Sequence, residues 1–271
     1  MKPFTCERAP ANTLRRSVDP LTLILVAVWS FIVSFFGGLV GLVLGNLRLP
    51  VVVLVGSSAA AAAGANVAIS GAAALTAAYA HWQGGRLSWR LFAWMAPTSF
   101  AGAVVGGLIS GVLPNRLLLG VIAVVVLYGA VEVWRYHRPA GGGEVAVPDR
   151  RDLLLNAALV GFGVGVLGGV VGLILGSLRL PALVRYVGVS PYAAVGTNAA
   201  VGAVVGLGGL VGHLPSGIDW AILGVGAAAA MPAAYLGARF TGRLDERQLL
   251  HAMAVVLLIS GTSMGIEAIA G

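Results

Sequence analysis

Polar residues divide the chain into a series of long apolar segments. These segments run at about 21–45, 59–80, 91–112, 117–134, 153–177, 191–212, 220–243 and 249–270. Roughly 20 apolar helical residues cross the hydrocarbon core of a bilayer, so each segment is long enough to span it. The segments do not alternate apolar and polar positions, as the strands of a membrane barrel do. The pattern predicts an all-α membrane protein with about eight transmembrane helices.

One phrase occurs twice along this pattern. Residues 37–50 read GGLVGLVLGNLRLP and residues 168–181 read GGVVGLILGSLRLP, which match at eleven of fourteen positions, 131 residues apart. Further matches follow at similar offsets: Gly64-Ala65-Asn66 with Gly196-Thr197-Asn198, His81 with His213, and Trp89 with Trp220. The chain is therefore read as two copies of one unit.

The copies define the expected organisation of the chain. We expect a cytoplasmic N-terminal tail (1–20), a first membrane repeat (21–134), a polar linker (135–152) that could join two separately packed halves, and a second repeat (153–271). Four helices in each repeat is an even number of crossings, which favours parallel repeats related by an axis along the membrane normal. Repeats of this kind are typical of transporters whose substrate lies between the halves.

A short broken segment is expected after the first helix of each repeat. The 32 residues from Pro181 to Gly212 would form a helix of about 48 Å, too long for a core of about 30 Å. Ser190 can cap a new helix and Pro191 can take its first position. Gly56-Ser57-Ser58 is the equivalent break in the first repeat. The segments 50–56 and 181–188 are then apolar but too short to span, which favours re-entrant half-helices buried in protein.

Composition supports the membrane class and narrows the partners. Of 271 residues, 58% are hydrophobic and 10% charged, which is too apolar for an ordinary water-soluble domain. The net charge of +7 comes from basic residues scattered over loops and helix ends, so we expect the lipid bilayer as a partner and no nucleic acid. With eight spans and the N-terminus inside, ten basic residues face the cytoplasm against seven for the opposite orientation. Both termini are therefore predicted to be cytoplasmic.

The candidate site consists of residues at equivalent positions in the two repeats. A helix that begins near Ser58 or Ser190 favours an anion at its N-terminus, and an asparagine lies about two turns further along each helix. Each copy of the repeated phrase also contains one arginine, Arg48 or Arg179. If the short segments fold back into the membrane, the two helix starts, the asparagines and these arginines could line one cavity. The predicted substrate-binding residues are Arg48, Arg179, Asn66, Asn198, Thr197, Ser57, Ser58 and Ser190. Two alternatives stay open: the arginines end a helix and extend to lipid headgroups, and the asparagines only join helices.

Other chemistry finds no support in the sequence. Four dispersed histidines and one cysteine make no metal-ligand cluster, and no phosphate-binding GxxxxGK[ST] loop is present, so no metal and no cofactor are expected. No serine or cysteine nucleophile has a plausible base near it. The chain is therefore not expected to be an enzyme.

The repeated phrase, the later G[AT]N, the His/Trp-containing turn and the helix with proline before Gly-Ala together resemble the sulfite exporter TauE/SafE family, also called the toluenesulfonate uptake permeases. The resemblance covers about 21–270. In that family a run of glycines usually precedes the proline, whereas here only Gly45 and Gly176 remain and an arginine stands nearby. The resemblance implies a permease of the bacterial inner membrane for small sulfur-containing anions such as sulfite or organosulfonates, in either direction.

The expected function is therefore transport of a small anion through a site between the repeats. Two other functions stay open: a passive anion channel, which the lack of carboxylates in mid-membrane favours, and a noncatalytic membrane scaffold, which the short loops disfavour. A homodimer is also left open.

Overall fold

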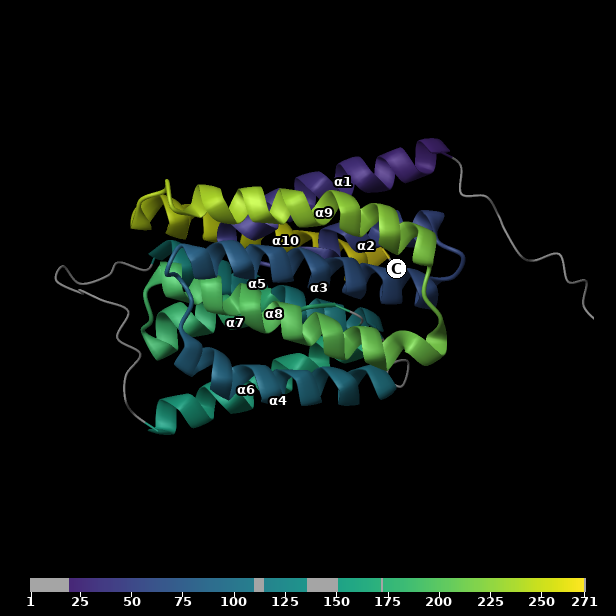
Figure 1. Ribbon diagram of the computed structural model, residues 1–271. Coiled ribbons are helices and arrows are strands. Elements are labelled where there is room, and N and C mark those ends of the chain that lie inside the picture. The colour runs from purple at the N-terminus through teal and green to yellow at the C-terminus, as the bar shows by residue number, and fades with distance from the viewer. Residues whose placement is uncertain (1–19, 110–114, 136–150, 172, 271) are drawn as a thin grey trace, which may run out of the picture.

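The structure, a computed structural model, is built from helices packed side by side (Figure 1). It describes residues 20–109, 115–135, 151–171 and 173–270, and within these ranges there is no strand. The long helices are α1 (Pro20–Val40), α3 (Ala59–Gln83), α4 (Trp89–Leu108), α5 (Asn115–Arg135), α6 (Arg151–Val171), α8 (Pro191–His213), α9 (Trp220–Thr241) and α10 (Glu246–Ala270). Two shorter helices, α2 (Gly45–Val55) and α7 (Gly176–Ala182), follow α1 and α6.

Seven of the long helices are long and apolar enough to cross a membrane, judged over the described ranges by length and composition. They are the long helices other than α5. Many large apolar side chains lie exposed on their outer faces, for example Leu159 at 70% and Ile266 at 61%. Such a surface is far more apolar than a monomer in water presents, and hydrocarbon is the solvent that suits it. The chain is thus a multi-pass membrane protein.

Each short helix follows a break in the chain, but it is part of a crossing and not the expected re-entrant half-helix, and the break lies earlier than expected. The expected first helix at 21–45 ends at Val40, and Gly41 turns the chain with a φ of +64°, which glycine adopts without strain. The N–H of Leu42 donates to the carbonyl of Gly37 over 2.8 Å and closes the end of α1. The arginine therefore lies inside α2, after the break. Arg179 lies inside α7 in the same way, and a π-helical turn (Leu183–Val187) extends that helix.

Serine side chains define the helix starts, as the sequence predicts. The Oγ atoms of Ser58 and Ser190 accept hydrogen bonds from the N–H groups of Ala61 (3.1 Å) and Ala193 (3.3 Å). Each hydroxyl satisfies one of the N–H groups that a helix start leaves without an intrahelical partner. Pro191 takes the first helical position of α8, where its missing N–H does no harm.

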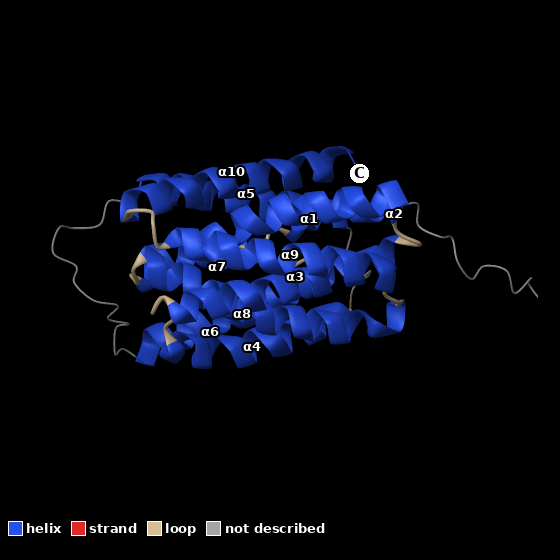
Figure 2. Ribbon diagram, turned by 45° about the horizontal axis from the view of Figure 1, so that its top comes forward, coloured by secondary structure: helices blue, strands red, loops and turns tan. Residues whose placement is uncertain are grey.

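The two halves of the chain are interleaved. Helix α1 packs along α9, and α6, its counterpart in the second copy, packs along α4. Helix α3 lies against α8 near the centre of the bundle, and α5 pairs with α10 at one side (Figure 2). The expected linker (135–152) lies mostly outside the described residues, and the two halves that it joins are not packed separately, because helices of one half lie along helices of the other.

Glycines permit this close packing. A Cβ at Gly38 would collide with the carbonyl of Ala234 in α9, and one at Gly237 with the carbonyl of Phe35 in α1. Gly102 and Gly106 of α4 meet the backbone of α6 in the same way. Small residues at such positions allow helix backbones to approach each other in a membrane.

The direction of the paired helices shows that the repeats are inverted, and the expected parallel arrangement is wrong. Along the α3–α8 contact, Gly64 lies beside His213, Gly71 beside Gly206, and His81 beside Gly196, so these matching helices run antiparallel. An axis that exchanges antiparallel helices lies in the membrane plane. In agreement, the beginning of α1 and the end of α10 lie at one end of the molecule, whereas α5 ends and α6 begins at the other (Figure 1).

The expected number of four crossings in each repeat is wrong because α2 completes a further crossing. Gly45 lies against Asn66 and Ser70 in the middle of α3, whereas Gly56 lies against Ala62 at its start. Residues 41–56 therefore return the chain to the end at which α1 begins. Each half then crosses five times, and an odd number inverts the second copy.

Candidate functional site

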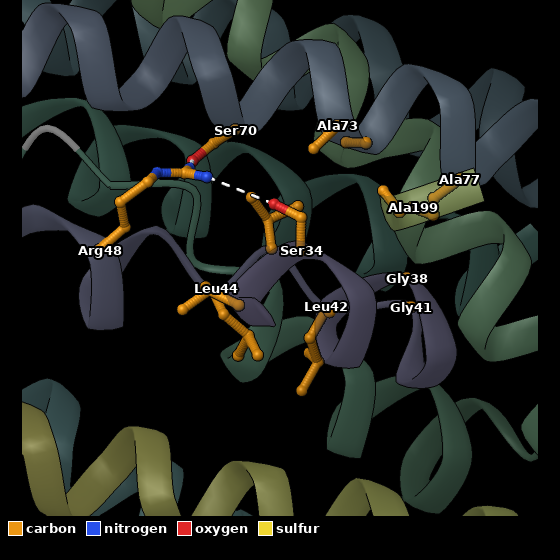
Figure 3. A pocket seen from close by; sticks show the side chains of 15 residues that line it. Ser34, Gly38, Gly41, Leu42, Leu44, Arg48, Ser70, Ala73, Ala77 and Ala199 are labelled. Atoms are coloured by element: carbon orange, nitrogen blue, oxygen red, sulfur yellow. Dashed lines mark hydrogen bonds between the residues drawn. The ribbon is translucent and has the colours of Figure 1, made fainter. Parts of the chain in front are cut away.

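Arg48 lies in the middle of the bundle, where α2 meets α1 and α3. Arg48 is only 2% exposed, although arginine has one of the largest side chains. Its Nε donates to Asn66 Oδ1 over 3.0 Å, and Nη2 donates to the hydroxyl of Ser70 and to the carbonyl of Asn66. Nη1 reaches the hydroxyl of Ser34 at 3.4 Å (Figure 3). Every guanidinium nitrogen thus has an acceptor in its own repeat.

Asn66 is the element that orients this arginine. Its Nδ2 donates to the carbonyl of Gly45 over 3.1 Å, which leaves Oδ1 directed to the guanidinium. All of these acceptors are neutral, so the hydrogen bonds satisfy the donors of Arg48 without compensating its charge. A positive charge therefore stays in the low-dielectric interior.

A small cavity adjoins Arg48 at the contact between the repeats. Its volume is about 20 Å³, which admits one water. The first repeat lines it with α1, α2 and α3, and the second repeat with Ala199 of α8 and Ala234 of α9. Figure 3 shows Arg48, Ser34 and Ser70 on one side and the small residues Gly38, Gly41, Ala77 and Ala199 on the other.

Arg179 is equally buried but lacks hydrogen bonds. It is 1% exposed, and its Nε, Nη1 and Nη2 have no partner among the described residues. Asn198, the counterpart of Asn66, donates to the carbonyls of Gly41 (2.8 Å) and Gly176 (3.3 Å). Its Oδ1 accepts nothing. Because buried polar atoms are nearly always paired and an unpaired buried charge is costly, the unpaired guanidinium of Arg179 needs an explanation.

The two arginines differ because the residues around them differ. Ser34 and Ser70, which accept from Arg48, correspond by position to Gly165 and Gly202. We define the first half-site as Ser34, Arg48, Asn66 and Ser70, and the second half-site as Gly165, Arg179, Asn198 and Gly202. The second has lost both hydroxyls of the first.

A larger cavity lies beside the second half-site. Its volume is about 190 Å³, and its lining includes Arg179, Met95, Asn156 and Val160. In the first repeat Trp29 takes the place that Val160 takes here, and its indole N–H donates to the carbonyl of Leu47 over 2.8 Å. A tryptophan therefore contacts the residue before Arg48, where the second repeat has the smaller valine. This cavity could hold about six waters, or a small anion with some of them.

The other predicted site residues lie apart from the arginines. Ser57 and Ser58 are exposed at the start of α3, and the N–H of Ser57 donates to Asp219 Oδ2 over 2.7 Å. Ser190 is buried as a helix cap, and Thr197 accepts from the N–H of Ser88 over 3.0 Å. Arg48 and Arg179 line different cavities, which share no lining residue, whereas the sequence suggested one cavity for both.

Sequence reasoning missed Ser34, Ser70 and Trp29, although a signal for them exists. They lie outside the best-matched phrase, and each differs from its counterpart in the other repeat. A search for similarity between the copies passes over such positions. A search for polar residues that one copy has lost would find both serines.

Comparisons with known proteins bear on this site. The family model for the sulfite exporter TauE/SafE matches residues 26–264. No curated protein and no solved structure matches the chain. The matched range begins in α1 and ends in α10, so it includes both half-sites and both cavities. A multi-pass bundle with two buried arginines, matched by that model over nearly all of its length, belongs to the sulfite exporter TauE/SafE family of membrane transporters.

Proposed function

We propose that this protein moves a small oxyanion, sulfite or an organosulfonate, across the bacterial cytoplasmic membrane, and that the anion binds at Arg179. The observation that carries the proposal is the guanidinium of Arg179, which is buried with three unpartnered nitrogens beside a cavity of about 190 Å³. A planar guanidinium donates in pairs to the oxygens of an oxyanion, which suits sulfite and sulfonate groups.

The inverted repeats support a carrier. In such transporters one half can be closed while its counterpart is open, and transport exchanges the two conditions. Here the cavity at Arg48 admits one water and the cavity at Arg179 is several times larger. The two share no lining residue, whereas a passive channel needs a continuous path. In the proposed cycle the anion is held between the repeats and Arg48 supplies a second positive charge to its path.

The arrangement of the loops supports an orientation opposite to the one expected from eight spans. Arg86 contacts the end of α9, and Trp134 at the end of α5 contacts His251 at the start of α10, so these loops share one end of the molecule. Among the described residues, the basic ones near that end are Arg86, Arg90, Arg135, Arg151, Arg239, Arg243 and Arg247. Arg116 lies near the other end, at the start of α5. We propose that the arginine-rich end is cytoplasmic and that Pro20 and Ala270 face outward.

The test is exchange of radiolabelled sulfite in proteoliposomes. Arg179→Gln should lower the exchange rate at least about tenfold, since hydrogen bonds to a charged group contribute about 1.5–3 kcal/mol each. Arg116→Gln, an exposed arginine away from both cavities, is the matched control and should exchange at the wild-type rate. Exchange by Arg179→Gln at the wild-type rate would refute the site. A voltage-driven current that does not saturate with sulfite would select the channel.

A further inference from the structure

A separate basic pocket lies at the arginine-rich end, between the ends of α3 and α9. It has a volume of about 420 Å³, and Arg86, Arg239 and Arg243 line it together with Gln83. None of the described residues that line it is acidic. Three guanidinium groups that converge without a carboxylate favour an anion with several oxygens.

The structure holds these arginines in place. Arg86 is half-buried, and its Nη2 donates to the carbonyl of Ala238 over 2.8 Å. The guanidinium of Arg239 lies 5.3 Å from the ring centre of Tyr235, and that of Arg243 lies 4.7 Å from the ring centre of Phe240. Stacking on a ring orients a guanidinium while its N–H groups stay available at its edge. The pocket is thus arranged before a ligand arrives.

The pocket lies in line with the cavity at Arg48. Ala77 of α3 and Ala234 of α9 line that inner cavity, and Ala80 and Leu236 of the same helices line the basic pocket. Ala77 and Ala80 are about 4.5 Å apart along the helix axis. The two spaces therefore follow one another along the contact between α3 and α9.

A buried histidine contacts a lining residue of each space. His81 is 0% exposed, and its Nδ1 accepts from Arg86 Nε over 3.1 Å. Its Nε2 lies 3.1 Å from the carbonyl of Gly38, which lines the inner cavity, so Nε2 carries the proton and donates. The contacts from Arg86 through His81 to Gly38 thus join the wall of the outer pocket to the wall of the inner one.

We propose that Arg86, Arg239 and Arg243 form an outer binding site that captures the transported oxyanion at the arginine-rich end, with the Arg86–His81 contact closing the way to the inner cavity. The proposal rests on the proposed function and extends it. A cluster of like charges raises the local concentration of an anion and its rate of association, and this effect weakens with ionic strength. The phosphate of an anionic lipid offers the same chemistry, so the experiment distinguishes the two sources.

The experiment measures sulfite exchange at several salt concentrations with the full chain in proteoliposomes. The variant is Arg239→Gln/Arg243→Gln, which keeps Arg86 and its contact with His81. At low ionic strength we expect a three- to tenfold loss of kcat/KM with kcat within twofold of the wild type, and a weaker salt dependence. Arg247→Gln removes an exposed arginine at the same end that does not line the pocket, and it should keep the wild-type kcat/KM and salt dependence.

Three results would overturn the proposal. One is an unchanged kcat/KM and salt dependence in the double variant. Another is an equal loss in Arg247→Gln, which would assign the effect to general surface charge. The third is a defect seen with phosphatidylglycerol in the vesicles but absent in pure phosphatidylcholine, which would assign the pocket to a lipid headgroup. Failure of the proposed function looks different, because Arg179→Gln would then exchange sulfite like the wild type, or the wild type would exchange none.

Discussion

The two half-sites have the same arginine and the same asparagine but different surroundings. Arg48 has hydrogen bonds from every guanidinium nitrogen, whereas Arg179 has none with the part of the chain that the structure describes. In each half-site the asparagine donates to the carbonyl at the start of the short helix, so the scaffold is preserved. What differs is the set of groups around the guanidinium: the first repeat satisfies the donors of Arg48, whereas the described residues leave those of Arg179 unsatisfied.

The largest expected effect is that substitution of Arg179 impairs transport, whereas substitution of Arg48 lowers stability. Arg179→Gln should abolish sulfite exchange without lowering stability, because it removes a buried charge without partners. Arg48→Gln should lower the free energy of unfolding by about 1.5–3 kcal/mol, because it breaks hydrogen bonds to a charged group and leaves Asn66 Oδ1 unsatisfied. Thermal unfolding in detergent and the exchange assay measure both. An equal loss of stability in the two variants would contradict the comparison.

Exchanging the valine and the tryptophan at the equivalent positions 160 and 29 should close the cavity beside Arg179 and open one beside Arg48. Val160→Trp should fill the space beside Arg179 and weaken sulfite binding about 5- to 150-fold, which corresponds to the cost of about 1–3 kcal/mol that is typical of an overpacked site. Trp29→Val should open the corresponding space by Arg48 and destabilise the protein by about 3 kcal/mol. Sulfite-induced thermal stabilisation reports the binding. Undiminished stabilisation of Val160→Trp would show that the cavity at Arg179 is not the binding space.

A smaller effect is expected from giving the second half-site one of the serine hydroxyls that the first half-site has. Gly202→Ser places a serine where Ser70 lies in the first half-site, and its Cβ would be 3.0 Å from a side-chain methyl of Val43. The new hydroxyl can accept from Arg179 and compete with the anion, so sulfite affinity should fall about three- to tenfold. The control is Gly224→Ser, whose Cβ would meet nothing within 4 Å. Equal sulfite affinity in both variants would argue against this role of the missing hydroxyl.

The smallest effect concerns a residue that sequence reasoning placed in the site. Ser58 caps α3 and is exposed. Ser58→Ala should lower the free energy of unfolding by about 1 kcal/mol, the usual contribution of a cap, and leave the KM for sulfite unchanged. Chemical unfolding and exchange kinetics measure the two quantities. A raised KM would return Ser58 to the binding site and weaken the distinction between cap and half-site.

The sequence predicts the helices of this protein better than their arrangement. Apolar segments long enough to span are local features, and so are the caps at Ser58 and Ser190. The inverted order of the repeats was missed because α2 is too short to be counted as a crossing, although with the turn at Gly41 it returns the chain across the membrane. The count of crossings depends on tertiary contacts of that segment, which no local pattern shows.

The site was predicted in part for a related reason. Two matched motifs led to the expectation that Arg48 and Asn66 line one cavity, and in the structure these two residues lie in contact. The lack of a pairing at Arg179 depends on Gly165 and Gly202, which stand where the first repeat has serines. A glycine in the sequence does not reveal that the equivalent residue of the other repeat supplies a hydroxyl. The size of a cavity likewise depends on which side chains from other helices reach it, as Trp29 and Val160 illustrate.

The interleaving of the halves has a consequence for biosynthesis. Helix α1 packs along α9, and α4 along α6, so the first half leaves the ribosome before its packing partners exist. Until then its glycine faces, including Gly38 and Gly102, have only lipid or a translocation partner to contact. Assembly must therefore wait for synthesis of the second half. Separately expressed halves should be degraded alone and recover function together, and a chaperone that shields small-residue faces would raise the yield of the intact chain.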